Sequence, residues 1–135
     1  MTTFFKQIVN SECNSFSVVI EDDGRVCYGY LLQDRNVIGD IWLYNQSPTP
    51  QDTQWDKRDM PFLNPAEFVK DNLIARPIIS DKDVRVEWLF LTGACILDQV
   101  RIFVRDELTA IIKPGAKPGW SILVKKDGPL AKFLS

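Results

Sequence analysis

The sequence predicts a mainly β domain, an antiparallel bent sheet or a sandwich, with α+β as the alternative. Short runs of apolar or alternating residues recur in both halves of the chain, and turn signals separate them at short intervals. Short connections of this kind imply antiparallel neighbours. The chain has 135 residues, 45% of them hydrophobic, which is enough to bury one core. We therefore expect a single domain, residues 1–135.

The N-terminal half is predicted to be a meander of four strands. The apolar runs that define them lie at residues 4–9, 16–20, 26–32 and 37–44. An Asp-Gly turn signal precedes the third run, and a polar Gln-Asp-Arg-Asn turn follows it. The core residues that the alternation predicts here and in the later strands are Tyr28, Tyr30, Ile41, Leu43, Val86, Trp88, Phe90 and Phe103.

The turn between the third and fourth runs implies a register. Pairing Leu32 with Val37 places Gly29 opposite Asp40, on the face of the sheet away from the core. Because Gly29 has no side chain, Asp40 and Trp42 would lie beside an open space on that face. Gly29, Asp40 and Trp42 are therefore our candidates for a small-ligand site. A shape adjustment of the sheet or a covering loop is the simpler explanation of the same space.

Proline marks the middle of the chain. Residues 46–63 are expected to form a long irregular loop, because prolines occur there among polar residues and cannot donate to a sheet ladder. Asn64 and Pro65 then suit the N-cap and the first position of a short helix.

The C-terminal half returns to strands, which we expect at residues 84–90, 96–104 and 108–112. A turn at residues 105–106 joins the last two and places Phe103, Leu108 and Ala110 on one face. Beyond them, Ser121 can cap a helical stretch as far as Lys126, so the C-terminal segment is expected to be helical.

The absence of histidine excludes several kinds of active site. Ser-His-Asp and Cys-His nucleophile systems and histidine-bearing zinc sites all need that residue. The glycines are scattered and form no phosphate-binding loop. We expect no cofactor and no metal. An enzyme would depend on carboxylates such as Asp40, Glu87 and Asp98, which nothing in their spacing pairs.

Charge and cysteine usage bear on partners and location. A net charge of −2 argues against nucleic acid, and no apolar run approaches the ~20 residues that a membrane span needs. No export signal is visible at the N-terminus. Cys13, Cys27 and Cys95 are widely spaced and odd in number, which favours three reduced thiols in a cytoplasmic protein.

The charges are segregated along the chain. Residues 12–40 contain six acids and two arginines, whereas residues 113–135 contain five lysines and one aspartate. Such a dipole can steer a charged protein partner, although an ordinary solvated surface is the simpler explanation. Tryptophan is a typical interface anchor, so Trp55 and Trp120 are our candidate partner-binding residues.

Two stretches resemble a group of small stand-alone bacterial proteins. They are Asp-Gly-Arg-Val-Cys-Tyr-Gly-Tyr-Leu-Leu at 23–32 with Gly-Asp-Ile-Trp-Leu-Tyr-Asn at 39–45, and Lys-Pro-Gly-Trp-Ser at 117–121 with the segment 126–132. The group has no assigned activity, so the resemblance implies a bacterial cytosolic source and no catalytic residues.

Three functions follow in order of preference. The first is a non-enzymatic protein-binding module of the immunity or accessory type, by analogy with other small acidic proteins. The second is a small-ligand-binding β domain with its site near Asp40 and Trp42. The third is a hydrolase that uses strand carboxylates. It is the least favoured, because the sequence does not offer a base, a nucleophile and an orienting group together.

Overall fold

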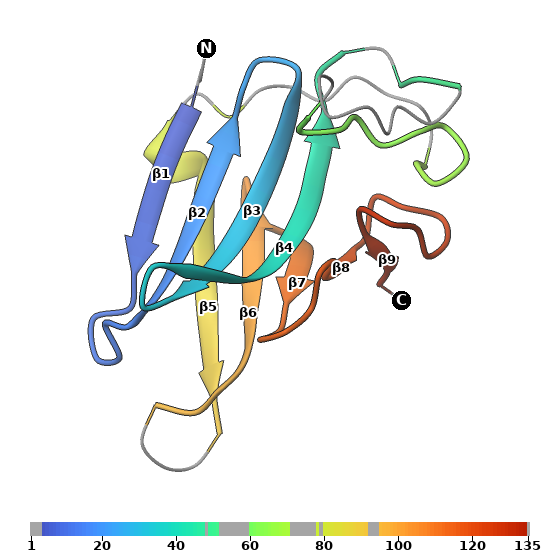
Figure 1. Cartoon of the computed structure of the whole chain (residues 1–135). Coiled ribbons are helices and arrows are strands. Elements are labelled where there is room, and N and C mark those ends of the chain that lie inside the picture. Colours follow the sequence, from blue (N-terminus) through green and yellow to red (C-terminus); the bar gives the residue numbers. More distant parts are fainter. Residues whose placement is uncertain are drawn as a thin grey trace.

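The computed structural model contains two β-sheets and describes residues 4–47, 49–51, 60–70, 78, 80–91 and 95–134 (Figure 1). The first sheet is antiparallel in sequential order: β1 (Phe4–Val9), β2 (Phe16–Asp22), β3 (Val26–Gln33) and β4 (Asn36–Asn45). The second sheet follows a short 3₁₀ turn, η2 (Asp81–Asp83), and has the order β5 (Val84–Phe90), β6 (Leu97–Val104), β7 (Glu107–Ile112), β8 (Trp120–Ser121) and β9 (Lys132–Phe133). The predicted mainly β architecture is confirmed.

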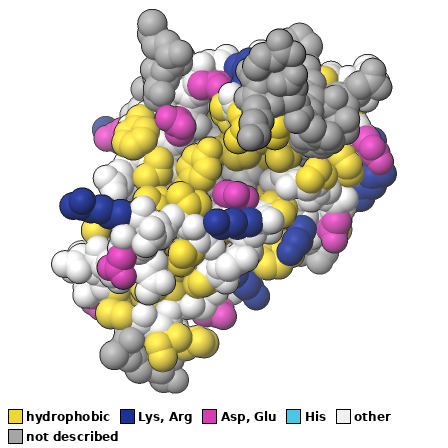
Figure 2. All heavy atoms as spheres, viewed as in Figure 1, with side chains coloured by type: hydrophobic (Ala, Val, Ile, Leu, Met, Phe, Trp, Pro, Cys, Tyr) yellow, Lys and Arg dark blue, Asp and Glu magenta, His cyan; other side chains and the backbone are white. Residues whose placement is uncertain are grey.

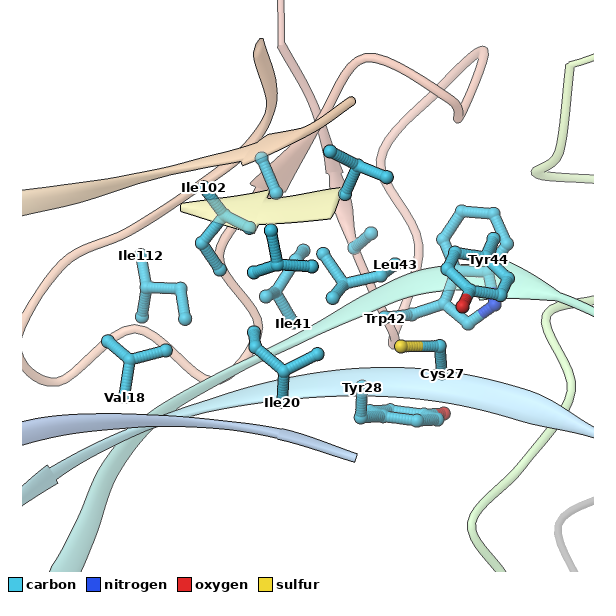
Figure 3. Close-up of a cluster of buried hydrophobic side chains, with 14 of the residues drawn as sticks. Val18, Ile20, Cys27, Tyr28, Ile41, Trp42, Leu43, Tyr44, Ile102 and Ile112 are labelled. Carbon is cyan, nitrogen blue, oxygen red and sulfur yellow. The ribbon is translucent and has the colours of Figure 1, made fainter. Parts of the chain in front are cut away.

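The core lies between the two sheets. Alternate residues of β2, β3 and β4 point toward β6 and β7, and their side chains meet in one cluster (Figure 3). A Cβ on Gly29 would lie 3.1 Å from Ile102 and 3.3 Å from Ile41, so Gly29 faces this core. Burial of each fully buried aliphatic side chain of the cluster stabilises the folded state by about 1.5–3 kcal/mol. This gain fixes which face of each strand is turned toward the core.

The C-terminal segment closes the free edge of β4. Gly115 N–H donates to Ile38 O at 2.7 Å, and Gly119 N–H donates to Asp40 O at 2.7 Å. Further along, Trp42 N–H donates to Leu130 O at 3.1 Å. These bonds satisfy edge groups that would otherwise remain open for pairing.

The predicted helical C-terminal segment is wrong. Ser121 does accept a hydrogen bond from Leu123 N–H at 3.0 Å, but the chain then makes a turn. Ser121 pairs with Ala110 of β7, and a Cβ on Gly119 would lie 2.3 Å from Ile111 O. Pairing with β7 and β4 therefore outweighs the local cap, as tertiary context commonly does.

The segment after Asn64 makes one turn, closed by Phe68 N–H to Pro65 O at 3.0 Å, and not the expected short helix. Asn64 does not cap it. Its backbone N–H and C=O are both bonded by the side chain of Asn45, each at 2.9 Å. Val69 then forms a bridge to Val124, which ends the turn. The described residues of the loop expected at 46–63 form no helix or strand.

Two of the three cysteines are bonded to each other, so the expectation of three reduced thiols is wrong. Cys13, in the β1–β2 connection, forms a disulfide with Cys95, which precedes β6. Cys27 is the free thiol and is buried. The expected cytoplasmic location rested in part on three reduced thiols, and the disulfide removes that argument. The location itself stays a prediction. Within the described residues, no helix is long and apolar enough to cross a membrane.

Candidate functional site

The β3–β4 hairpin begins in the predicted register and then changes it. Leu32 pairs with Val37 as expected, but a β-bulge follows, and Leu31 pairs with Gly39. Beyond the bulge, Gly29 lies opposite Ile41 and Tyr30 lies opposite Asp40. The predicted pairing of Gly29 with Asp40 is therefore wrong.

The corrected register defines the surface of the first sheet that faces away from the core, here called the outer face of β1–β4. Cross-strand neighbours form three rows on it, Phe5–Glu21–Tyr28–Trp42, Gln7–Val19–Tyr30–Asp40 and Val9–Ser17–Leu32–Val37. In an antiparallel sheet with one buried face, the other face is usually polar. Here eight of the twelve positions are apolar or aromatic, two are acidic and none is basic.

Trp42 and Tyr28 are buried, but the rest of this apolar surface is at least partly accessible. Phe5 is 58% exposed, Val9 51% and Val37 42%. Val19, Tyr30 and Leu32 between them are half-buried. Figure 2 shows hydrophobic side chains across the middle of the view, with acidic and basic side chains among them. Contiguous exposed apolar surface of this kind is typical of an interaction site.

A hollow of about 220 Å³ lies at the β4 side of the outer face. Its lining residues are Tyr28, Tyr30, Asp40, Met60, Pro61, Phe62, Lys117, Pro129 and Leu130. The Tyr28 hydroxyl donates to Phe62 O at 2.6 Å, and the rings of Tyr28 and Tyr30 stack with their centroids 6.1 Å apart. These contacts hold two aromatic rings in place on one wall.

The Asp40 carboxyl is the acidic group of the hollow. Burial raises its pKa above the usual aspartate value, and the positive charge of Lys117 acts against this shift. Within the described residues, no hydrogen bond or ion pair engages the carboxylate. Burial also raises the pKa of Tyr30 to about 12 and raises the pKa of Tyr28, so both phenols are neutral near pH 7. The hollow therefore offers aromatic surface and one carboxylate, a combination that suits a cation, with the Lys117 ammonium as a competing charge.

Only one of the three ligand-site candidates reaches this hollow. Trp42 is 1% exposed, and its indole N–H donates to the Asn45 side chain at 2.8 Å. Gly29 faces the core. Asp40 lines the hollow, together with Tyr28 and Tyr30, which the sequence analysis assigned to the core. A ligand-binding role for Asp40 stays a prediction.

The two partner-binding candidates have different positions. Trp55 lies outside the described residues. Trp120 is half-buried on β8, in the second sheet, and its ring lies near the ammonium groups of Lys113 and Lys132.

The three carboxylates of the hydrolase hypothesis are not brought together. Glu87 is exposed on the second sheet and pairs with Arg85 at 3.1 Å, while Asp40 lies on the outer face of the first sheet. Asp98 accepts a hydrogen bond from its neighbour Gln99 at 3.2 Å. In the part of the chain that the structure describes, no group of three metal-ligating residues is found.

A buried polar cluster at the end of β2 was not predicted, because Asp22 and Gly24 read as a turn signal and Tyr44 as the end of a strand. The Asp22 carboxylate is fully buried and accepts hydrogen bonds from Gly24 N–H at 2.8 Å and the Tyr44 hydroxyl at 2.7 Å. Tyr44 in turn accepts from Ile78 N–H at 3.1 Å. Burial raises the pKa of the neighbouring Cys27 thiol, which stays protonated. These bonds connect structural segments and leave no reactive group exposed.

Comparisons of the chain with protein-family models, with curated proteins and with solved structures give no match. The resemblance to small bacterial proteins therefore stays an expectation, and the functional argument rests on geometry.

Proposed function

We propose that this chain is a non-enzymatic protein-binding module of the immunity or accessory type, and that its partner binds the outer face of β1–β4. The observation that carries the proposal is the apolar character of this face. A solvated sheet surface would be stabilised by polar side chains, whereas Phe5 and Val9 are more than half exposed and continuous with Val19 and Tyr30.

The charges of the same face suggest the chemistry of the partner. Glu21 and Asp40 are its acidic positions, and no basic residue occupies any of the three rows. A partner surface with apolar side chains and a lysine or arginine would complement it. Nucleic acid would be repelled by these carboxylates, which favours a protein partner.

Variants of the outer face test this proposal. The chain is used to isolate its partner from lysate of the source cells, and the affinity of the purified partner is then measured for Phe5→Ser and Tyr30→Ser. Loss of a buried aromatic anchor commonly weakens binding by at least about tenfold. Leu91→Ser is the matched control, because Leu91 is 52% exposed and lies outside the three rows.

The outcomes are distinct. Weaker binding by Phe5→Ser and Tyr30→Ser, with wild-type affinity in Leu91→Ser, supports the assignment. Wild-type affinity in both outer-face variants, or an equal loss in all three, contradicts it. Thermal unfolding of each variant shows whether its fold is retained.

A second candidate is a small cationic ligand in the hollow beside Asp40. Asp40 and the stacked rings of Tyr28 and Tyr30 favour it, since a cation gains from both the carboxylate and the ring faces. Tetramethylammonium should then raise the melting temperature through preferential binding to the folded state. Asp40→Asn should abolish this increase, and an equal increase in both proteins would exclude the site.

A further inference from the structure

A second surface with the opposite charge lies on the other side of the molecule. In the second sheet, one cross-strand row runs through all the strands as Glu87–Arg101–Ile111–Trp120–Lys132. Neighbouring residues such as Val100, Ile102 and Ile112 are fully buried in the core, so the row lies on the surface of the second sheet that faces away from β1–β4. We call this surface the outer face of β5–β9.

Positive charge gathers around the tryptophan of that row. The ammonium of Lys132 lies 4.9 Å from the centroid of the Trp120 ring, and the ammonium of Lys113 lies 5.5 Å from it. Arg101 is two strands away in the same row. Trp120 is half-buried, so part of the residue is accessible beside these cations.

These three cations have no carboxylate partner among the described residues. Glu87, the acid of the row, pairs instead with Arg85 at 3.1 Å, and Arg85 also contacts Asp106. Like charges that are held together repel one another, and a bound anion would relieve that repulsion.

We propose that Trp120, Lys113, Lys132 and Arg101 form a second binding surface, which accepts an acidic segment of a protein partner. Carboxylates would bind the three cations, and an apolar or aromatic side chain would lie against Trp120. A protein segment is favoured because it can place carboxylates beside an apolar or aromatic side chain, which suits cations grouped around a tryptophan.

This inference goes beyond the proposed function. The three rows of the outer face of β1–β4 carry two acids and no base, whereas this row and its neighbour Lys113 carry three bases and one acid. Two faces with opposite charge, on opposite sides of one sandwich, allow the chain to hold two different partners at once. The chain would then act as an adaptor.

An NMR titration tests the second surface. The ¹⁵N-labelled chain is titrated with the peptide acetyl-Glu-Glu-Phe-Glu-Glu-amide, and with the same peptide carrying Gln in place of each Glu. The readout is the indole N–H signal of Trp120, assigned by its loss in Trp120→Phe. We expect the acidic peptide to shift this signal and the neutral peptide to leave it unchanged.

Charge variants separate the site from general attraction. Lys132→Glu should weaken peptide binding by about tenfold, as expected for reversal of a charge in direct contact. Lys82→Glu makes the same change in net charge at an exposed position on η2, outside the row, and should change the affinity by less than about twofold.

Three results would overturn the proposal. They are an unshifted Trp120 signal, equal losses in Lys132→Glu and Lys82→Glu, and tighter binding of an oligothymidylate than of the acidic peptide. Tyr30→Ser distinguishes this proposal from the previous one, because it should retain peptide binding while losing the partner of the outer face of β1–β4. Retained dispersion of the amide spectrum shows that each variant is folded.

Discussion

The Tyr44 hydroxyl donates a hydrogen bond of 2.7 Å to the Asp22 carboxylate, and both residues are buried. The same hydroxyl accepts from Ile78 N–H, so it links the first sheet to the segment before β5. Tyr44→Phe removes both bonds and leaves a buried carboxylate with fewer donors. Unpaired buried groups of this kind cost about 1–3 kcal/mol. We expect a decrease of that size in the free energy of unfolding, measured by urea titration.

Tyr30→Phe is the control for that measurement. It also removes a tyrosine hydroxyl from the first sheet, but Tyr30 is half-buried on the outer face, where no hydrogen bond from its hydroxyl to the described residues is found. Equal stability of Tyr44→Phe and the wild type would contradict a structural role for the Asp22 cluster.

The disulfide predicts a redox-dependent stability. Cys13 and Cys95 are 82 residues apart in sequence, so their bond restricts a long loop of the unfolded chain. Loop-closure entropy assigns a stabilisation of about 4 kcal/mol to a bond of this span. The double variant Cys13→Ser, Cys95→Ser should lose a comparable amount in urea unfolding. Dithiothreitol should destabilise the wild type and leave the double variant unchanged, and an effect on both would point to another cause.

The sequence predicted the hairpins but not which residues face the core. Both two-residue turns occur where expected, and their residues have positive φ, 51° and 72° at Asp34 and Arg35 and 50° and 64° at Arg105 and Asp106. A β-bulge follows each turn and shifts the pairing of the two strands by one residue. Beyond the bulge, residues that the turn alone would place on the same face of the sheet lie on opposite faces. Tyr30 therefore lies on the outer face and not in the predicted core. A bulge is set by packing between sheets, which the alternation of one strand does not contain.

The second hairpin shows the same effect. Phe103 pairs with Leu108 as the turn predicts, but the bulge then pairs Ile102 with Ala110. Ala110 is fully buried and does not share the outer face with Phe103. Of the predicted core, Tyr28, Ile41 and Leu43 belong to the buried cluster, Tyr30, Val86, Trp88 and Phe90 are partly buried against it, and Phe103 is outside it. Asp40 does line a hollow, but the lining residues 60–62, 117 and 129–130 escaped prediction, because they meet there only through the fold.

Gly29 provides a direct test of the observed register. An alanine Cβ at this position would lie 3.1 Å from Ile102, 3.3 Å from Ile41 and 3.4 Å from Ile20, inside a close-packed core. Overpacking of this kind costs about 1–3 kcal/mol. If Gly29 instead faced the open space implied by the register predicted from the turn, Gly29→Ala would leave the stability unchanged. The melting temperature of Gly29→Ala therefore distinguishes the two registers.

The pH dependence of stability should contain a contribution from Asp40. Burial raises the pKa of this carboxyl in the folded chain above its unfolded value, so the folded state binds more protons between the two pKa values. The stabilising contribution is then present below the unfolded pKa near 3.8 and is lost as the pH rises through the folded pKa. Asp40→Asn should remove this pH-dependent loss of stability, measured by the melting temperature in thermal unfolding curves recorded above pH 3.8.

Lys117→Gln extends the same argument. The positive charge of Lys117 lowers the pKa of Asp40 and partly offsets the effect of burial. Its removal should raise the Asp40 pKa further, move the loss of stability to higher pH and favour an external cation in the hollow. A ¹³C NMR titration of the Asp40 carboxyl measures the shift directly. An unchanged or lowered Asp40 pKa in Lys117→Gln would mean that the ammonium does not act on the carboxylate.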